Sequence, residues 1–158
     1  MKRLLALLLA YASAEAKSIV TDDFIDKVAV IESNYNYDAV GDKGKAIGAW
    51  QMHEPAFREA CVYLAHRGIA RDEWLGFADN HKKFAKDPLV GRLACKAYFE
   101  ILEKQMLRHK AKVTPIALYM AYNMGFHGAW VQKFDHKSFW LDNKRKSILA
   151  RANHILSR

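Results

Sequence analysis

The sequence lacks the features that mark metal sites, repeat architectures and membrane domains. Its seven histidines lie outside the spacings typical of metal ligands, so we expect no metal and no cofactor. After an apolar run at 4–12 no second long apolar run follows, and we therefore expect no permanent membrane span. There is no internal repeat, low-complexity tract or interdomain linker. These absences leave a chain suited to one domain with a single core.

Acidic residues are scarce relative to basic ones. The formal net charge is +8, from 25 lysines and arginines against 17 aspartates and glutamates. Such a cation is attracted to anionic partners, for example cell-wall polymers. The basic residues are spread along the chain, and Lys144-Arg145-Lys146 is their only tight run. Because they are not interleaved with aromatic residues as in single-strand binders, we expect no nucleic-acid partner.

The first residues have the pattern of a secretory signal. A basic start at Lys2 and Arg3 precedes the leucine-rich run, and Ala14-Glu15-Ala16 has the small-x-small form of a cleavage site. We expect a signal peptide at 1–16 and a mature domain at 17–158, exported to the periplasm or the extracellular space. An uncleaved anchor and a buried N-terminal helix are the alternatives.

Two cysteines, Cys61 and Cys95, remain after removal of the signal. In an oxidising compartment they can pair, and closing that loop would stabilise the fold by about 3–4 kcal/mol in the chain-entropy model. The alternative is two buried free thiols, because both residues fall on apolar faces of expected helices. Export favours the disulfide. No histidine-centred motif accompanies either residue, so neither is expected to be catalytic.

The hydrophobic periodicity is helical almost throughout, which predicts a mainly α fold. The helical period is lost between Asn34 and Ala46, where Asp42-Lys43-Gly44 predicts a tight turn or a short β-hairpin. Capping residues and proline positions set the helix boundaries. We expect helices from Thr21 to Glu32, over 54–68, over 71–77, from Asp87 to about Lys110, from Thr114 to a break at Gly125 and Gly128, and from Ser138 onward.

Glu32 lies at the end of the first expected helix, directly after the apolar run Val28-Ala29-Val30-Ile31. Apolar surroundings disfavour a charged carboxylate and so raise its pKa. A carboxylic acid that stays protonated near neutral pH can donate a proton to a glycosidic oxygen. The simpler interpretation is an ordinary solvated glutamate near a helix end.

Three sequence blocks share a family likeness. Glu32-Ser33-Asn34-x-Asn36, Gly48-x-x-Gln51 and Ala121-Tyr122-Asn123-Met124-Gly125 resemble, in this order, the motifs of lysozyme-like lytic transglycosylases. The resemblance covers roughly residues 22–130 and implies a lysozyme-like single domain with the turn-rich segment after the catalytic helix. The stretch Gly41-Asp42-Lys43-Gly44 also resembles goose-type lysozymes, which are hydrolases.

The resemblance also implies an activity. Glu32 would cleave the β-1,4 bond between N-acetylmuramic acid and N-acetylglucosamine in peptidoglycan, first as acid and then as base, leaving a 1,6-anhydro end. Ser33, Gln51, Tyr122 and Asn123 would bind the substrate. The structural alternatives are a solvent-facing Ser33, a Gln51 amide that satisfies the hairpin backbone, and an aromatic and an amide that serve only as core and cap. The implied partner is a glycan strand, bound by a monomer.

Other functions stay open at this level. Asp42 is a good turn residue, but it could instead be a second carboxylate that positions water in a hydrolytic muramidase. Ala49-Trp50 replaces the usual leucine-methionine pair before the glutamine, and no tyrosine follows Tyr122, which leaves the choice between transglycosylase and hydrolase undecided. An inactive glycan-binding module and a small exported structural or inhibitory protein are the remaining alternatives.

Overall fold

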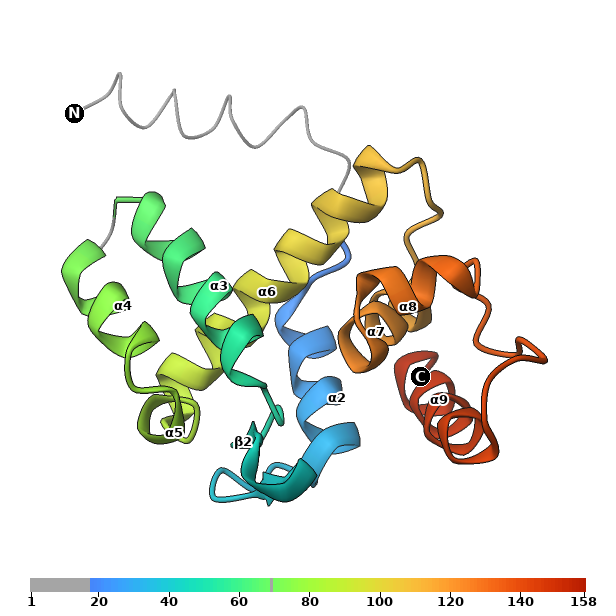
Figure 1. Cartoon of the computed structure of the whole chain (residues 1–158), viewed down its shortest axis with the longest axis horizontal. Coiled ribbons are helices and arrows are strands. Elements are labelled where there is room, and N and C mark those ends of the chain that lie inside the picture. The colour runs from blue at the N-terminus through green and yellow to red at the C-terminus, as the bar shows by residue number, and fades with distance from the viewer. Residues whose placement is uncertain (1–17, 69) are drawn as a thin grey trace.

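The computed structural model describes residues 18–68 and 70–158, and the signal peptide expected at 1–16 lies outside these residues. Helices make up most of the described chain, as the periodicity predicted (Figure 1). In chain order the elements are α2 (Asp22–Ser33), β1 (Val40–Gly41), the 3-10 turn η1 (Asp42–Gly44), β2 (Ala46–Ile47), α3 (Glu54–His66), α4 (Arg71–Ala78), α5 (His81–Phe84), α6 (Pro88–Arg108), α7 (Pro115–Met124), α8 (Phe126–Val131) and α9 (Asn143–Leu156).

Side-chain caps start three of the helices at the positions that the sequence predicted. The hydroxyl of Thr21 accepts a hydrogen bond from the Phe24 amide, and the hydroxyl of Thr114 accepts one from the Ala117 amide. The carboxylate of Asp87 accepts from the amides of Leu89 and Val90, ahead of the long α6. Each cap satisfies backbone donors that have no partner within the helix.

The C-terminal third differs from the expectation in two places. The last helix begins at Asn143 rather than Ser138, because the carboxylate of Asp142 accepts from the Arg145 amide and caps α9 there. Gly125 ends α7 as expected, but Gly128 does not break the chain and lies within α8. The short helices α5 and α8 were not predicted, because so few residues cannot show a helical period.

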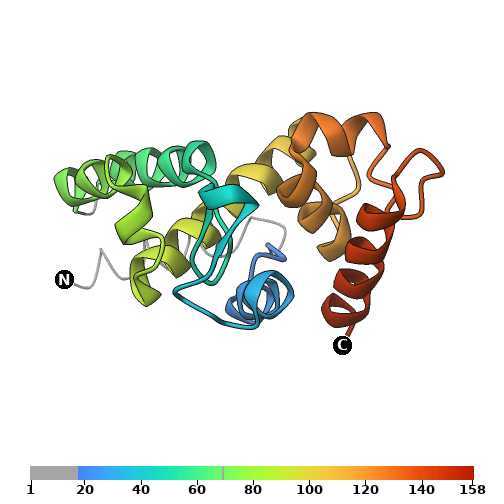
Figure 2. The same ribbon diagram turned by 60° about the horizontal axis from the view of Figure 1, so that its bottom comes forward.

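The helices form two groups that α6 connects. Figures 1 and 2 show α3 and α4 on one side of α6. Helices α7, α8 and α9 lie on the other side, and α2 lies between the two groups. Contacts of α6 with α3, α2 and α7 hold the arrangement together. The core contains large buried side chains, including Trp50, Phe57, Phe99 and Tyr119. Within 18–68 and 70–158, no helix is long and apolar enough to cross a membrane.

The segment after α2 is a short hairpin. Strands β1 and β2 pair antiparallel, with Val40 opposite Ile47 and Gly41 opposite Ala46, and η1 makes the turn between them. Lys43 within the turn has a left-handed backbone, with φ of 53°. The hairpin lies where the sequence lost its helical period.

Both cysteines are free and buried, so the disulfide that the sequence favoured is not formed. Cys61 lies on α3 and Cys95 on α6, each among apolar neighbours of the core. Burial raises the pKa of the Cys61 thiol to about 12 and that of Cys95 well above its usual range. Because the thiolate is the reactive form, both thiols are chemically quiet in this setting.

Candidate functional site

Glu32 lies in the last turn of α2 and is largely buried. Burial raises the pKa of its carboxyl group from 4.5 to about 6, against the opposing effects of a hydrogen bond from Tyr119 and the positive charge of Arg151. The Tyr119 hydroxyl on α7 donates to Oε1 of Glu32 at 2.8 Å. Glu32 is therefore a carboxyl group that holds its proton to higher pH than a solvated glutamate does, in a fixed orientation.

The end of α2 is held from two directions. Arg151 on α9 donates to the backbone carbonyl of Ile31 at 2.9 Å and so satisfies one of the last carbonyls of the helix. Asn34 follows in the left-handed conformation, with φ of 54°, and the backbone N–H groups of this C-cap donate to the carbonyls of Ala29 and Val30. This double closure fixes the backbone that carries Glu32.

Hydrogen bonds join the three sequence blocks in pairs. The Ser33 hydroxyl donates to the Ala49 carbonyl at 2.8 Å, which connects the first block to the second. The Tyr122 hydroxyl donates to the Trp50 carbonyl at 2.5 Å, which connects the third block to the second. The Tyr119 bond to Glu32 connects α7 to the first block. Residues separated by up to 87 positions therefore meet around one carboxyl group.

Gln51 acts within the turn that contains it. Its backbone is left-handed, with φ of 49°, and its side-chain Nε2 donates to the Gly48 carbonyl at 2.9 Å. Its Oε1 packs against Gly41, where a methyl group would overlap it. The amide thus satisfies the hairpin backbone, which is the structural alternative considered from the sequence.

Close packing fixes the turn that contains Gly48. Gly48 has φ of 78°, and a methyl group on it would overlap the backbone carbonyl of Ala85. Trp50 is almost fully buried, and its indole N–H donates to the Ile25 carbonyl at 3.0 Å. Trp50 is therefore a core residue that holds the second block against α2, and its ring does not lie at the surface.

Asn123 lies close to Glu32, and Asp42 does not. The side chain of Asn123 is partly buried and lies beside the Tyr119 hydroxyl. Asp42 is exposed on the η1 turn, and its carboxylate lies 3.3 Å from Nε2 of His53. Asp42 therefore pairs with His53. Within residues 18–68 and 70–158, no other carboxylate is among the groups that shift the pKa of Glu32.

Two residues around Glu32 were not singled out as site residues from the sequence. Tyr119 lies on α7, one turn before the Tyr122 that was expected to bind the substrate. That spacing was the available signal. Arg151 lies in the last helix, outside the region of family resemblance, and no local pattern distinguishes it from the other basic residues of α9.

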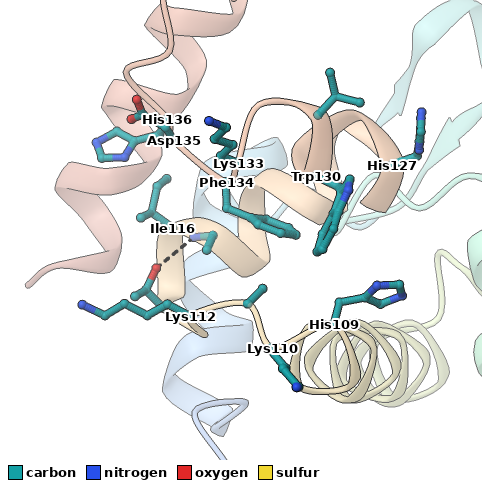
Figure 3. A pocket seen from close by; sticks show the side chains of 14 residues that line it. His109, Lys110, Lys112, Ile116, His127, Trp130, Lys133, Phe134, Asp135 and His136 are labelled. Atoms are coloured by element: carbon teal, nitrogen blue, oxygen red, sulfur yellow. Dashed lines mark hydrogen bonds between the residues drawn. The ribbon is translucent and has the colours of Figure 1, made fainter.

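A large cavity lies elsewhere in the fold. It has a volume of about 920 Å³, and neither Glu32 nor the residues expected to bind substrate line it (Figure 3). In the described part of the chain, no group of three or more histidine, cysteine or acidic side chains could hold a metal ion. Comparisons with protein-family models, curated proteins and solved structures find no match for this chain.

Proposed function

We propose that this chain is a lysozyme-like peptidoglycan lytic transglycosylase with Glu32 as its catalytic residue. The observation that carries the proposal is the pairwise hydrogen bonding of three distant blocks around one largely buried carboxyl group with a pKa of about 6. If the likeness of the three blocks to the family motifs were accidental, hydrogen bonds between the blocks would not be expected. The reaction requires one acid that is protonated near the working pH, which fits this carboxyl group.

Glu32 serves both steps of the proposed reaction. Protonated Glu32 gives its proton to the oxygen that bridges the two sugars, and the 2-acetamido group of the substrate stabilises the positive centre that forms. The resulting carboxylate then takes the proton from the 6-hydroxyl of the muramic acid, which closes the 1,6-anhydro ring. The hydrogen bond from Tyr119 keeps the carboxyl group in one orientation through both transfers.

The surroundings of Glu32 favour this route over one with two carboxylates. Glu32 accepts a hydrogen bond from Tyr119 and lies near the positive charge of Arg151, while the candidate second acid, Asp42, is exposed and pairs with His53. A hydrolytic muramidase in which Asp42 positions water is the second candidate, because that carboxylate is accessible to solvent. In both cases the substrate is a glycan strand, and the protein acts outside the cytoplasmic membrane as an exported monomer.

Digestion of purified peptidoglycan tests the proposal. Glu32→Gln keeps the shape of the side chain but removes the acidic proton, so activity should fall at least about a hundredfold. The matched control is Glu59→Gln, an exposed glutamate on α3, which should keep wild-type activity. Near-normal turnover by a folded Glu32→Gln protein would overturn the proposal.

Mass spectrometry of the released muropeptides separates the two candidates. The transglycosylase reaction gives anhydro ends, tolerates Asp42→Asn and is strongly reduced by Asn123→Ala. A hydrolase gives reducing ends. In that case Asp42→Asn should reduce activity more than Asn123→Ala does. Reducing ends as the main product would replace transglycosylation with hydrolysis and leave the role of Glu32 in place.

A further inference from the structure

The large cavity lies in the C-terminal part of the fold, away from Glu32. Its walls are the end of α6, the connection from α6 to α7, the first turn of α7, helix α8 and the segment after α8 (Figure 3). Its volume of about 920 Å³ is within the range that holds a small organic ligand. Neither the blocks of family resemblance nor the proposed reaction explains this cavity.

The interior of the cavity is apolar and aromatic. Figure 3 shows the rings of Trp130 and Phe134 near its centre, with Ile116 on the opposite wall. The two rings are 6.2 Å apart and nearly perpendicular, and the His109 ring lies 5.0 Å from Trp130. Trp130 is 42% exposed although it lies in this cluster. An apolar ligand body placed between these rings would cover aromatic surface that now faces solvent.

The edge of the cavity is positively charged. In Figure 3 the amino groups of Lys110, Lys112 and Lys133 point outward around the aromatic centre. None of these lysines forms a salt bridge with a carboxylate of residues 18–68 or 70–158. Asp135 is the one acidic residue in the lining, and its carboxylate accepts from the nearby Lys137 amide at 2.9 Å. The edge therefore offers positive charge to a ligand.

The backbone on both sides of the cavity is held in a costly conformation. Lys110, Lys133 and Phe134 have φ of 54°, 54° and 55°, in the left-handed region. That conformation costs about 1–2 kcal/mol for each residue that is not glycine. The consecutive left-handed residues Lys133 and Phe134 send one side chain to the edge and the next to the centre (Figure 3). Such local strain is often found at binding sites.

We propose that this cavity binds a small soluble amphipathic acid. Its flat apolar body lies against Trp130 and Phe134, and its single carboxylate, sulfonate or phosphate group lies at the cationic edge, to whose positive charge Lys112 and Lys133 both contribute. The complementarity of an aromatic centre and a cationic edge carries this inference, which is independent of the proposed reaction at Glu32.

A matched pair of fluorescent probes tests the proposal on the full-length protein. Anilinonaphthalene sulfonate carries an aromatic body and one anionic group, and N-phenylnaphthylamine has the same body without the anion. The sulfonate should bind with one-to-one stoichiometry and more tightly than the neutral compound. The double variant Lys112→Gln/Lys133→Gln should weaken sulfonate binding about tenfold and leave binding of the neutral probe unchanged.

Control variants separate the cavity from general surface charge. The pair Lys82→Gln/Lys144→Gln removes two exposed lysines that do not line the cavity, and sulfonate binding should not change. Trp130→Ala should weaken binding of both probes, with circular dichroism used to verify the fold. Equal affinity for the two probes, or equal loss in both double-lysine variants, would overturn the proposal.

Vesicles separate a soluble ligand from a membrane surface. Phe139 and Trp140 are each 81% exposed and follow the cavity in sequence, so an anionic bilayer is the competing occupant. Co-sedimentation with phosphatidylglycerol vesicles that needs Phe139 and Trp140 and also displaces the sulfonate probe would assign the cavity to a membrane surface and overturn the proposal. Specific probe binding without vesicle association supports it.

Discussion

The Glu32 region and the C-terminal cavity differ in whether their polar side chains have bonding partners within the protein. Around Glu32, each key side chain bonds to a segment far away in sequence: Ser33 to Ala49, Tyr119 to Glu32 and Tyr122 to Trp50. Around the cavity, the lysines have no carboxylate partner in the described chain, and the acid Asp135 bonds to a residue two positions away. The first region is fixed by its own bonds, and the second keeps charge available.

This difference separates two kinds of site. A proton-transfer site gains from groups that are already in place, because reorganisation during the reaction costs rate. A ligand site gains from unpaired charge and open apolar surface, because both can be satisfied on binding. Under the two proposals, each region has the polar arrangement that its task requires.

The largest expected effect on stability concerns the turn that carries the second block. Gly48→Ala should lower the free energy of unfolding by about 3 kcal/mol, because the methyl group overlaps the Ala85 carbonyl and the backbone is left-handed. Urea denaturation measures the loss. The control is Gly44→Ala, which has φ of 88° but no atom within 4 Å of the added methyl group, and it should cost about 1 kcal/mol. Equal losses in the two variants would show that Ala85 does not constrain the turn.

The second prediction concerns the cost of burying Glu32. Because its pKa is raised from 4.5 to about 6, the folded protein binds the proton more tightly than the unfolded chain does. This contribution to stability is complete below pH 4.5 and is lost as the pH rises through 6. Glu32→Gln cannot ionise, so it should be more stable than wild type by about 2 kcal/mol at about pH 8 and equally stable at about pH 4.

Thermal unfolding at the two pH values measures this difference. Glu59→Gln, on the exposed face of α3, should show no pH-dependent gain. A stability difference for Glu32→Gln that does not depend on pH would mean that the carboxyl group is not desolvated. The expected gain contrasts with the loss of activity in the same variant, as in other sites where function is favoured over stability.

Much of the fold could be read from local signals. Thr21, Asp87 and Thr114 each precede a helix and cap it in the structure, because capping depends on residues within three positions. The start of α9 was wrong, because Ser138 and Asp142 are both good capping residues and the sequence does not rank them. The disulfide was also wrong, because compartment and spacing do not determine whether two buried thiols are joined.

The sequence predicted one property of Glu32 and missed two of its neighbours, while the roles of the motif residues stay predictions. Glu32 and its raised pKa followed from the apolar run before it, and that part of the prediction is confirmed. Tyr119 and Arg151 reach Glu32 and Ile31 only through tertiary packing, in which α9 contacts both α2 and α7, and local patterns do not encode that packing. The cavity was also missed, although its lining residues all lie within 109–136, because they meet only when α7 and α8 pack together, and no motif marks that packing.

The third prediction changes the orienting bond alone. Tyr119→Phe removes the hydroxyl that donates to Glu32, and that bond favours the carboxylate. The pKa of Glu32 should rise further, so the alkaline limb of the activity profile should move to higher pH. Turnover should fall about tenfold at low pH, because the acid is less well oriented. Rates of peptidoglycan digestion across the pH range measure both effects.

The control for Tyr119→Phe is a similar bond in another place. The Tyr63 hydroxyl donates to Glu100 at 3.1 Å, in a contact between α3 and α6 that does not involve Glu32. Tyr63→Phe should therefore change neither the pH profile nor the rate. If Tyr119→Phe lowered the rate without moving the alkaline limb, the hydroxyl would support only the packing of α7.

The smallest expected effect comes from removing one serine hydroxyl, either in a long-range hydrogen bond or in a local one. Ser33→Ala removes the donor to Ala49 and the acceptor for the Asn36 amide, and it should destabilise the protein by about 1 kcal/mol. Ser138→Ala removes a hydroxyl that donates to Gln132, six positions away, and should cost about 0.5 kcal/mol. The Ser33 bond joins α2 to the second block, so its loss should also lower activity, whereas the loss at Ser138 should not.

Urea denaturation and peptidoglycan digestion on the same samples measure both quantities. If the two variants proved equal in stability and activity, the hydrogen bonds between blocks would not be what holds Glu32 in place, and the packing of α9 against α2 and α7 would have to supply that role.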